Sequence, residues 1–198
     1  MLDEEILVVS SDELKDFLGG ESGFVQIGEE EIKRFIKEKG FFKERNKVEE
    51  DERYRQIIPY VIFMEDDKIL LLKRTEKQAE KRLRGKYSIG VGGHIRKEDG
   101  ENPWDAFLKG LKREFNEEIE AVLYEIIYLG LINDLRTPVS RVHVGLLYLA
   151  KGKFLGIREK EMFQWQLLNK EDLKKFEGVM EGWSKLALVA LKYYHLLS

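Results

Sequence analysis

Residues 113–118 constrain the fold of this chain more than any other stretch. They place an arginine and three glutamates close together, as Arg113, Glu114, Glu117 and Glu118. At about 100° per residue, positions i, i+3 and i+4 lie on one side of a helix. Three carboxylates there repel one another, and hard cations such as Mg²⁺, which take carboxylate oxygens and keep several waters, relieve that repulsion. The spacing therefore predicts a helix that carries a metal site; the alternative is a solvated acidic face.

The residues before this cluster predict how the helix begins. Asn102-Pro103 is typical of an N-cap followed by proline at the first helical position, and it opens a helix that we expect to reach about Ile119. Upstream, the pair Gly92-Gly93 lets backbone approach a metal closely and leaves a carbonyl free for it, with a plain turn as the alternative. Gly110 lies on the glutamates' face, where glycine costs about 1 kcal/mol relative to alanine. We hypothesise that it makes room for a phosphate or a neighbouring loop; close helix–strand packing is the alternative.

The run 113–118, Arg-Glu-Phe-Asn-Glu-Glu, resembles the second half of the Nudix box in type and spacing. The box reads Gly, five residues, Glu, seven residues, then Arg-Glu-hydrophobic-x-Glu-Glu-x-Gly-hydrophobic. The first half here is longer, because seven residues separate Gly93 from Glu101 and eleven separate Glu101 from Arg113. Glu101 is one candidate for the first acid, since four extra residues make about one helical turn. Asp105, at the family's spacing from Arg113, is the other.

The resemblance implies a Nudix-like α/β/α sandwich with a mixed sheet, and the Gly-Gly-His start of the run is similar to a subgroup of predicted phosphoesterases. It also implies hydrolysis of a phosphoanhydride bond in a nucleoside diphosphate-linked or related small molecule, with Mg²⁺ as the cofactor and Mn²⁺ as a substitute. The implied metal ligands are Gly93, Glu114, Glu117 and Glu118, and Arg113 would fix the glycine loop by pairing with Glu101 or Asp105. The sequence departs from the box at Glu120, where the family has glycine.

Residues outside the box are candidates for the remaining roles. The general base comes either from the box or from a later loop, where Glu159 and Glu161 stand just before an expected strand; both also suit ordinary loop charges. For the substrate we single out four side chains that suit phosphates or the wall of a site: Arg74, Arg84, His94 and Arg141. Each has a solvated or structural role as its alternative.

Composition limits the class of protein. The chain has 198 residues, 43% of them hydrophobic, which suits one large domain or a domain with an extra subdomain. The net charge of −3 shows no basic footprint for nucleic acid, and the absence of cysteine excludes disulfides and thiolate chemistry. No apolar run is long enough to span a membrane, and the acidic N-terminus is unlike a signal peptide. We expect a cytoplasmic protein with a small-molecule diphosphate substrate and with no nucleic-acid or membrane partner. The sequence leaves the oligomeric state open, and a homodimer is one possibility because proteins that resemble this one commonly dimerise.

The polar stretch 46–54 is expected to divide an N-terminal extension, residues 1–54, with a small α/β structure, from a Nudix-like domain, residues 55–198. Apolar runs and alternation predict strands at 6–9, 57–64, 68–73, 88–95, 124–132, 142–151 and 163–168. Periodicity and caps predict helices starting near residue 11, over 29–39 and 102–119, near 169, and from about 182 to 197. The helix over 102–119 should pack through one apolar stripe: Trp104, Leu108, Leu111, Phe115 and Ile119.

Two other functions compete with hydrolysis. A nucleotide- or metabolite-sensing module could keep this fold without turnover, although a pure binder has little use for three clustered glutamates. An isomerase acting on an allylic diphosphate is disfavoured, since enzymes of that type resemble one another in using a cysteine and this chain has none.

Overall fold

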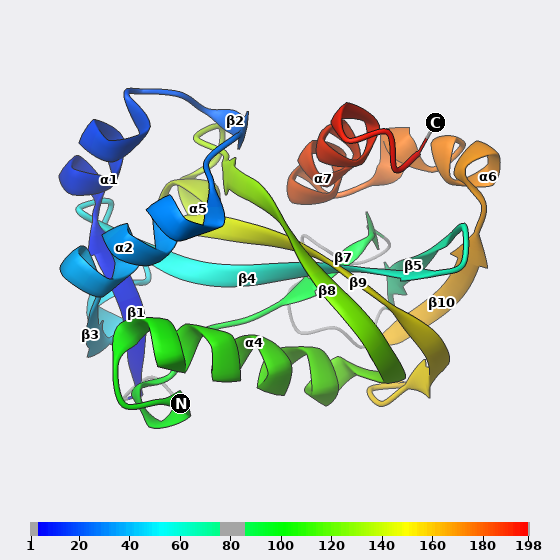
Figure 1. The fold of residues 1–198 in the computed structure, drawn as a ribbon, viewed down its shortest axis with the longest axis horizontal. Helices are drawn as coiled ribbons and strands as arrows, with labels where there is room; N and C mark the ends of the chain where they lie inside the picture. The colour runs from blue at the N-terminus through cyan, green and yellow to red at the C-terminus, as the bar shows by residue number, and fades with distance from the viewer. Residues whose placement is uncertain (1–3, 76–85, 198) are drawn as a thin grey trace. The chain divides into compact units, whose positions relative to one another are not determined.

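The computed structural model describes residues 4–75 and 86–197 of the chain (Figure 1). Helices and strands are mixed along the chain, as predicted for an α/β protein. In chain order the elements are β1 (Glu5–Ser10), α1 (Ser11–Leu18), β2 (Gly23–Val25), α2 (Glu29–Lys39), β3 (Phe41–Glu44), α3 (Arg45–Val48), β4 (Tyr54–Glu65), β5 (Lys68–Arg74), β6 (Tyr87–Ser88), β7 (Gly90–Gly92), η2 (Lys97–Asp99), α4 (Pro103–Glu118), β8 (Ile119–Asn133), α5 (Pro138–Arg141), β9 (His143–Ile157), β10 (Phe163–Leu168), α6 (Lys170–Lys174), η3 (Glu177–Val179) and α7 (Gly182–Tyr193).

The chain divides into two compact units, each built from three separate segments. The first unit holds Met1–Tyr60, Gly92–Glu114 and Gly130–Leu146. The second unit holds Val61–Val91, Phe115–Leu129 and Leu147–Ser198. Four long elements, α4, β4, β8 and β9, therefore contribute residues to both units.

The first unit is organised around the N-terminal strand. β1 pairs antiparallel with β3, from Glu5↔Glu44 to Val8↔Phe41, and through its last residues with the start of β4. Its inward-facing residues Ile6 and Val8 pack with Val48 of α3 in a fully buried cluster. The amphipathic helices α1 and α2 lie next to each other, with the Phe17 and Phe35 rings stacked at a centroid distance of 4.4 Å (Figure 1). Burial of these apolar faces stabilises the two helices, because helices this short are marginal in water on their own.

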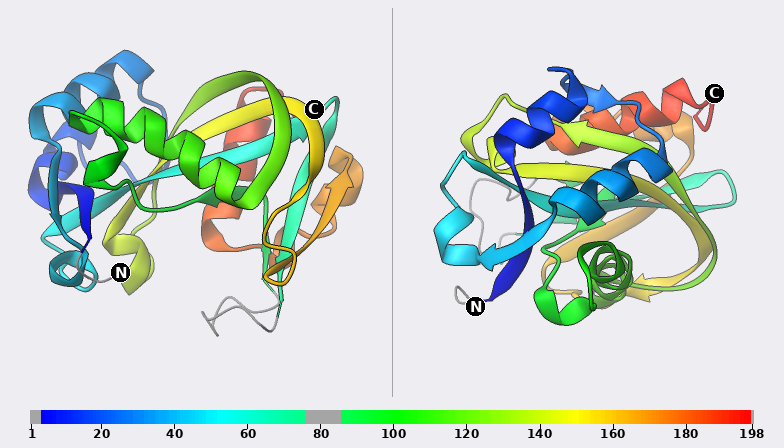
Figure 2. Two further views of the ribbon diagram at one scale, coloured as in Figure 1. Left: turned by 90° about the horizontal axis from the view of Figure 1, so that it is seen from below. Right: turned by 60° about the vertical axis from the view of Figure 1, so that its left-hand side comes forward.

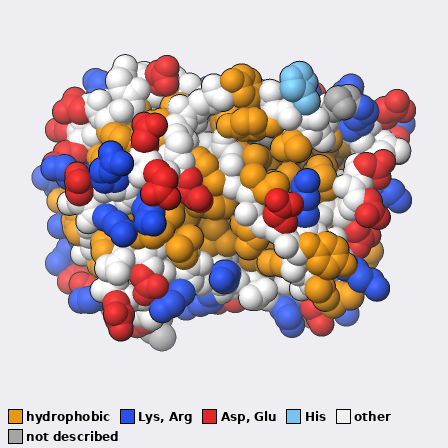
Figure 3. All heavy atoms as spheres, viewed as in Figure 1, with side chains coloured by type: hydrophobic (Ala, Val, Ile, Leu, Met, Phe, Trp, Pro, Cys, Tyr) orange, Lys and Arg blue, Asp and Glu red, His pale blue; other side chains and the backbone are white. Residues whose placement is uncertain are grey.

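The second unit is a sheet with helices beside it. β5 pairs antiparallel with both the end of β4 and β10, in register from Phe163↔Arg74 to Leu168↔Ile69. The last turn of α4 packs on this unit's strands through Phe115, whose ring lies 6.1 Å from that of Phe63. α7 buries Ala187, Ala190 and Leu191 but keeps other apolar side chains at the surface, visible over α7 in Figure 3.

The start of α4 is capped as its sequence predicts. The Asn102 side chain accepts a hydrogen bond from the Asp105 amide at 3.0 Å, and the Asn102 carbonyl accepts from Ala106 at 2.9 Å. These contacts satisfy amides that have no partner within the helix. Figure 2 looks almost along α4 in its right-hand view. The helix therefore begins at a defined residue, which sets the phase of every later side chain on it.

The structure corrects several element predictions. The expected strand 88–95 is two short strands, β6 and β7, and the expected loop before β9 contains α5. Two short strands, β2 and β3, were not predicted, and α7 ends at Tyr193 rather than Leu197. Leu108, assigned to the buried stripe of α4, is 40% exposed, while Phe107 beside it is fully buried. The buried stripe therefore includes Phe107 in place of Leu108, and the Phe107 ring stacks on Trp104, one turn earlier in α4. In the described part of the chain, no helix is long and apolar enough to cross a membrane.

Candidate active site

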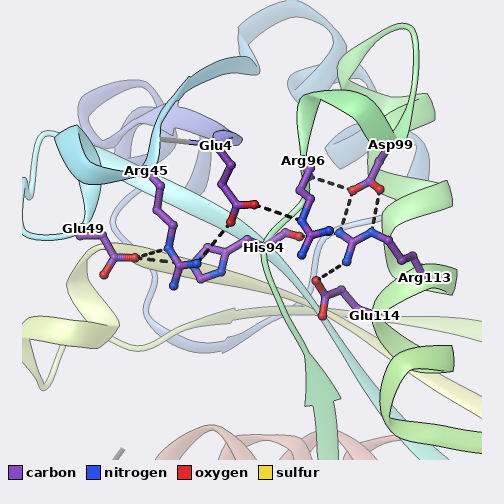
Figure 4. Close-up of polar contacts among 8 residues, drawn as sticks. All are labelled: Glu4, Arg45, Glu49, His94, Arg96, Asp99, Arg113 and Glu114. Atoms are coloured by element: carbon purple, nitrogen blue, oxygen red, sulfur yellow. Dashed lines mark hydrogen bonds and ion pairs between the residues drawn. The ribbon is translucent and has the colours of Figure 1, made fainter. Parts of the chain in front are cut away.

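Arg113 on α4 ties the glycine loop to the helix (Figure 4). Its guanidinium donates two hydrogen bonds to the Asp99 carboxylate, from Nε at 2.7 Å and from Nη2 at 2.8 Å. Nη2 also donates to the His94 carbonyl at 2.9 Å, and Nη1 donates to Glu114 Oε1 at 2.7 Å. A planar guanidinium is suited to such forked contacts. One side chain therefore fixes the loop, η2 and the first glutamate of the cluster together.

The predicted role of Arg113 is thus present, but its partner is Asp99 and not Glu101 or Asp105. Asp105 instead caps the start of α4, where its carboxylate accepts from the Glu101 amide at 3.0 Å, and Glu101 is exposed. Sequence reasoning missed Asp99, although residues 94–98 separate it from Gly93 by the five positions of the box. The spacing of Asp99 from Gly93 could have identified it. The stretch between Asp99 and Arg113 is longer than in the box, and this difference hid the match.

Asp99 is held as a carboxylate. Its side chain is only 8% exposed, and that burial acts to raise its pKa. The hydrogen bonds from Arg113 and from the Arg96 backbone amide outweigh burial, so the net pKa of Asp99 lies below its usual value. Asp99 therefore stays charged at neutral pH.

Gly93 lies directly against the Glu114 carboxylate. A Cβ at this position would overlap both oxygens of Glu114, so no other residue fits here without moving that side chain. Gly92 is equally confined, because a Cβ there would overlap the Pro59 carbonyl. The glycine pair brings the Gly93 backbone beside the first acidic group of the cluster, and its approach to a metal stays a prediction.

Gly110 makes room for the loop rather than for a ligand. A Cβ on Gly110 would lie 2.5 Å from Ile95 Cδ1 and 2.8 Å from Asp99 Oδ2. The sequence suggested that Gly110 makes room for a phosphate or for a neighbouring loop, and the structure supports the loop. The glycine lets η2 and the residues before it pack against α4.

The N-terminal residues also support the loop. The Leu7 amide donates to the Ile95 carbonyl at 2.8 Å, so β1 holds the loop through its backbone. Glu4 bridges two arginines, with Oε1 3.2 Å from Arg45 Nη1 and Oε2 3.2 Å from Arg96 Nε (Figure 4). Nothing in the sequence pointed to this network, because its members are far apart in the chain.

His94 points into this arginine-rich surrounding. Burial lowers its pKa to about 3, and the positive charges of Arg45 and Arg96 act in the same direction. Its Nε2 has no hydrogen-bond acceptor or donor within the described residues, and Glu49 Oε1 lies 3.9 Å away. At neutral pH the imidazole is therefore uncharged, and that contact is not an ion pair.

The other two glutamates of the cluster, Glu117 and Glu118, lie one turn further along α4. Glu117 is exposed and Glu118 is half-buried. Within residues 4–75 and 86–197, no three or more acidic or histidine side chains are gathered into a group that could hold a metal ion. Mg²⁺ does not require one, because it binds through one or two carboxylates and keeps its waters. The oxygen donors beside Gly93 fit such an ion.

The remaining predicted residues are dispersed. Arg74, in the second unit, pairs with Glu181 at 2.6 Å, and Glu161 is exposed in the turn before β10. Arg141, in the first unit, pairs with Glu52 at 2.5 Å. Arg84 lies outside the described residues. The structure therefore brings together Gly93, His94, Arg113 and Glu114.

Comparisons with known proteins place the chain in a family. No protein-family model matches it. Protein YmaB of Bacillus subtilis (strain 168) is 34% identical over 157 residues, covering 75% of this chain and 76% of that protein. The crystal structure of Tm1382, assigned to the Nudix hydrolases, is 46% identical and covers 95% of this chain and 98% of its own, with a TM-score of 0.88.

A more distant structure shares the fold alone. The Nudix domain of NrtR from Shewanella oneidensis, solved with ADP ribose, is 14% identical with a TM-score of 0.52, covering 71% of this chain and 88% of its own. The predicted fold class is confirmed by these matches: a mixed α/β fold with a mixed sheet and helices, as in Nudix proteins. Together with the glycine loop held to the acidic helix, the likeness to Tm1382 over nearly the whole of both chains shows that this protein belongs to the Nudix hydrolase family.

Proposed function

We propose that the protein hydrolyses a phosphoanhydride bond in a nucleoside diphosphate-linked or related small molecule, with Mg²⁺ as its cofactor. The observation that carries this proposal is the contact of Gly93 with the Glu114 carboxylate, which Arg113 supports by bonding Glu114 and the carbonyl of His94, the residue after Gly93. Such a contact brings a backbone segment and a carboxylate together at one place. It supports a site for a hard cation and a diphosphate rather than a solvated acidic face.

Gly93, Glu114, Glu117 and Glu118 are the residues that would hold the cation. When bound, it neutralises the diphosphate and lowers the pKa of a coordinated water. Arg113 orients Glu114 through the 2.7 Å hydrogen bond and keeps that carboxylate charged and in place. Neutral His94, beside Gly93, can donate its one ring N–H to a phosphate oxygen without adding charge.

The general base is proposed to be Glu161, exposed in the turn before β10, with Glu159 and the box glutamates as alternatives. Arg74, Arg84 and Arg141 remain proposed phosphate contacts. Arg74 would have to leave Glu181 to serve in this way, and Arg141 would have to leave Glu52.

The test is a substrate panel followed by mass spectrometry. Purified protein is incubated with Mg²⁺ and nucleotide sugars, dinucleoside polyphosphates, NADH, nucleoside triphosphates, non-nucleoside diphosphates and ADP-ribose, the ligand of the NrtR domain. We expect one class to be cleaved, and Glu118→Gln to lower kcat/KM at least about a hundredfold, because several kcal/mol of transition-state stabilisation depend on the cation. Glu120→Gln is the matched control, because Glu120 is exposed and stands at the box position where the family has glycine; it should keep full activity.

Two results would contradict the proposal. Cleavage that persists without a divalent cation, or in the Glu118→Gln variant, would show that the acidic helix is not the site. Tight binding of a panel member with Mg²⁺ present but no product would favour the sensing module instead.

A further inference from the structure

A cavity of about 380 Å³ lies within the first unit, apart from the glycine loop. It is enclosed by α1, the start of β4, the end of β8 and the segment that leads into α5, elements that lie near one another in Figure 1. Its volume is in the range of small-molecule sites. None of its lining residues belongs to the set proposed to hold the cation.

Arg55 of β4 lines this cavity and is almost fully buried, at 5% exposure. Its Nη2 donates to Asn133 Oδ1 at 2.7 Å and to the His143 carbonyl at 2.6 Å, and Nε donates to the same carbonyl at 3.1 Å. All these acceptors are neutral. They hold the guanidinium in one orientation without neutralising it.

No carboxylate forms an ion pair with Arg55 in the described part of the chain. Asp134, whose charge does reach Arg55, is bonded to Arg136 at 2.8 Å. Burial consequently lowers the pKa of Arg55 to about 10, only partly opposed by Asp134. A buried cation without a counter-charge is costly, and an anion entering the cavity would relieve that cost.

The geometry leaves room for such an anion at one end of the guanidinium. Nη1 of Arg55 has no acceptor among the described residues, whereas Nε and Nη2 are both used. Carboxylate and phosphate oxygens are the groups that match guanidinium donors best. Nη1 is therefore the donor that a ligand oxygen would meet.

The rest of the lining limits the ligand to one anionic group. Glu52 is already paired with Arg141 at 2.5 Å, so that pair is neutral overall. The other charged side chains of the lining, Asp12, Lys15 and Glu21, are exposed, where water screens them. Buried Leu14 and Leu18 of α1 give the cavity an apolar wall. A polyphosphate would find too few cations here, and a small organic anion finds both one buried cation and apolar surface.

We propose that this cavity binds a small organic molecule through one oxyanion group, a carboxylate or a phosphate monoester, which Arg55 holds. The lining of this site comes from the N-terminal helix α1 and from strands β4 and β8. The first 54 residues therefore have a binding role in addition to their support of the glycine loop. It is separate from the residues proposed to hold the cation, although its lining includes Arg141, one of the phosphate contacts proposed above.

The test is calorimetric titration of the full chain in EDTA with benzoate and phenyl phosphate, with benzyl alcohol as the uncharged comparison. We expect at least one anion to bind with one equivalent, and benzyl alcohol not to bind. Which anion binds distinguishes a carboxylate from a phosphate monoester. Arg55→Lys should weaken binding about tenfold to a hundredfold, because lysine keeps the charge but loses the fork.

Arg53→Met is the matched control: this arginine is two residues away on the same segment, 81% exposed and outside the lining, and its loss should leave binding unchanged. Asn133→Asp is the second variant, since it places a carboxylate where the amide oxygen meets Arg55 at 2.7 Å and should abolish binding while keeping the arginine. The proposal is overturned if neither anion binds the unaltered chain. It is also overturned if Arg55→Lys, or Asn133→Asp where Arg55→Lys does not fold, binds as the unaltered chain does.

Discussion

The pKa of an individual side chain in this protein depends on its neighbours as well as on its exposure. Asp99 and Arg55 are both buried, but Asp99 receives a forked arginine while Arg55 receives only neutral oxygens. Burial acts to raise the pKa of Asp99, but its hydrogen bonds with Arg113 outweigh burial and lower that pKa. The pKa of Arg55 is lowered by burial itself. Their roles follow: the first is a structural anchor and the second is open to a ligand.

Asp99→Asn should destabilise the protein and slow turnover. Loss of a buried, charge-assisted pair with Arg113 should cost about 2 kcal/mol of unfolding free energy, measured by urea denaturation. The freed loop should lower kcat/KM about tenfold or more, since positioning of reacting groups is sensitive to small shifts. Glu101→Gln, exposed and two residues away, is the control. Equal effects of the two changes would show that Asp99 is not the anchor.

Among the helices and strands, α4 shows best how one element is set by several weak local signals. Asn102 fixes where it begins, Phe115 fixes which side meets the strands, and Gly110 fixes how closely the loop approaches. The glycine is unfavourable for an isolated helix by about 1 kcal/mol relative to alanine. Its retention is explained by the Ile95 and Asp99 side chains, which occupy the space that a Cβ would need.

Gly110→Ala should therefore destabilise the protein despite the higher helix propensity of alanine. Overpacking against Ile95 and Asp99 should cost about 1–3 kcal/mol, which outweighs the gain of about 1 kcal/mol in propensity. Thermal unfolding and kcat measure the two consequences, and both should fall. Gly178→Ala, where a Cβ meets nothing within 4 Å, should change neither. A more stable, fully active Gly110→Ala variant would show that the loop does not need this space.

Stability of the whole protein should depend on two half-buried histidines. Burial lowers the pKa of His94 to about 3 and also lowers that of His143, which lies 6.0 Å from it between ring centroids. Both groups bind protons more readily in the unfolded chain, near pH 6.5. Their contribution to stability is therefore fully present above about pH 6.5 and is lost as the pH falls toward the folded values.

We expect the free energy of unfolding to fall below about pH 6.5 by up to about 1.4 kcal/mol per pH unit for each histidine. Urea denaturation between pH 4 and pH 8 in EDTA measures the slope. His143→Gln should reduce that slope, whereas His195→Asn, at an exposed position, should leave it unchanged. A flat profile in the unaltered chain would mean that neither histidine is buried uncharged.

Much of this protein could be read from local pattern. The bounds of α2 and β10, the cap of α4 and the acidic face of its last turn follow from periodicity and cap residues within a few positions of one another. Short-range signals suffice there because helix phase and strand alternation are properties of neighbouring residues. The family resemblance rested on the same kind of signal, since residues 113–118 are contiguous.

Only the tertiary structure decided which distant groups meet. The pairing of Arg113 with Asp99 was hidden by the long insertion between them, and the bridge from Glu4 to Arg45 and Arg96 joins segments that no local pattern connects. The short strands β2 and β3 have too few residues to show alternation and form only because β8 and β1 pair with them. The surroundings of Arg55 also depend on the tertiary structure, because α1 and β8 place a cavity rather than a carboxylate beside it. The energy of a buried charge is set by the groups that surround it in space.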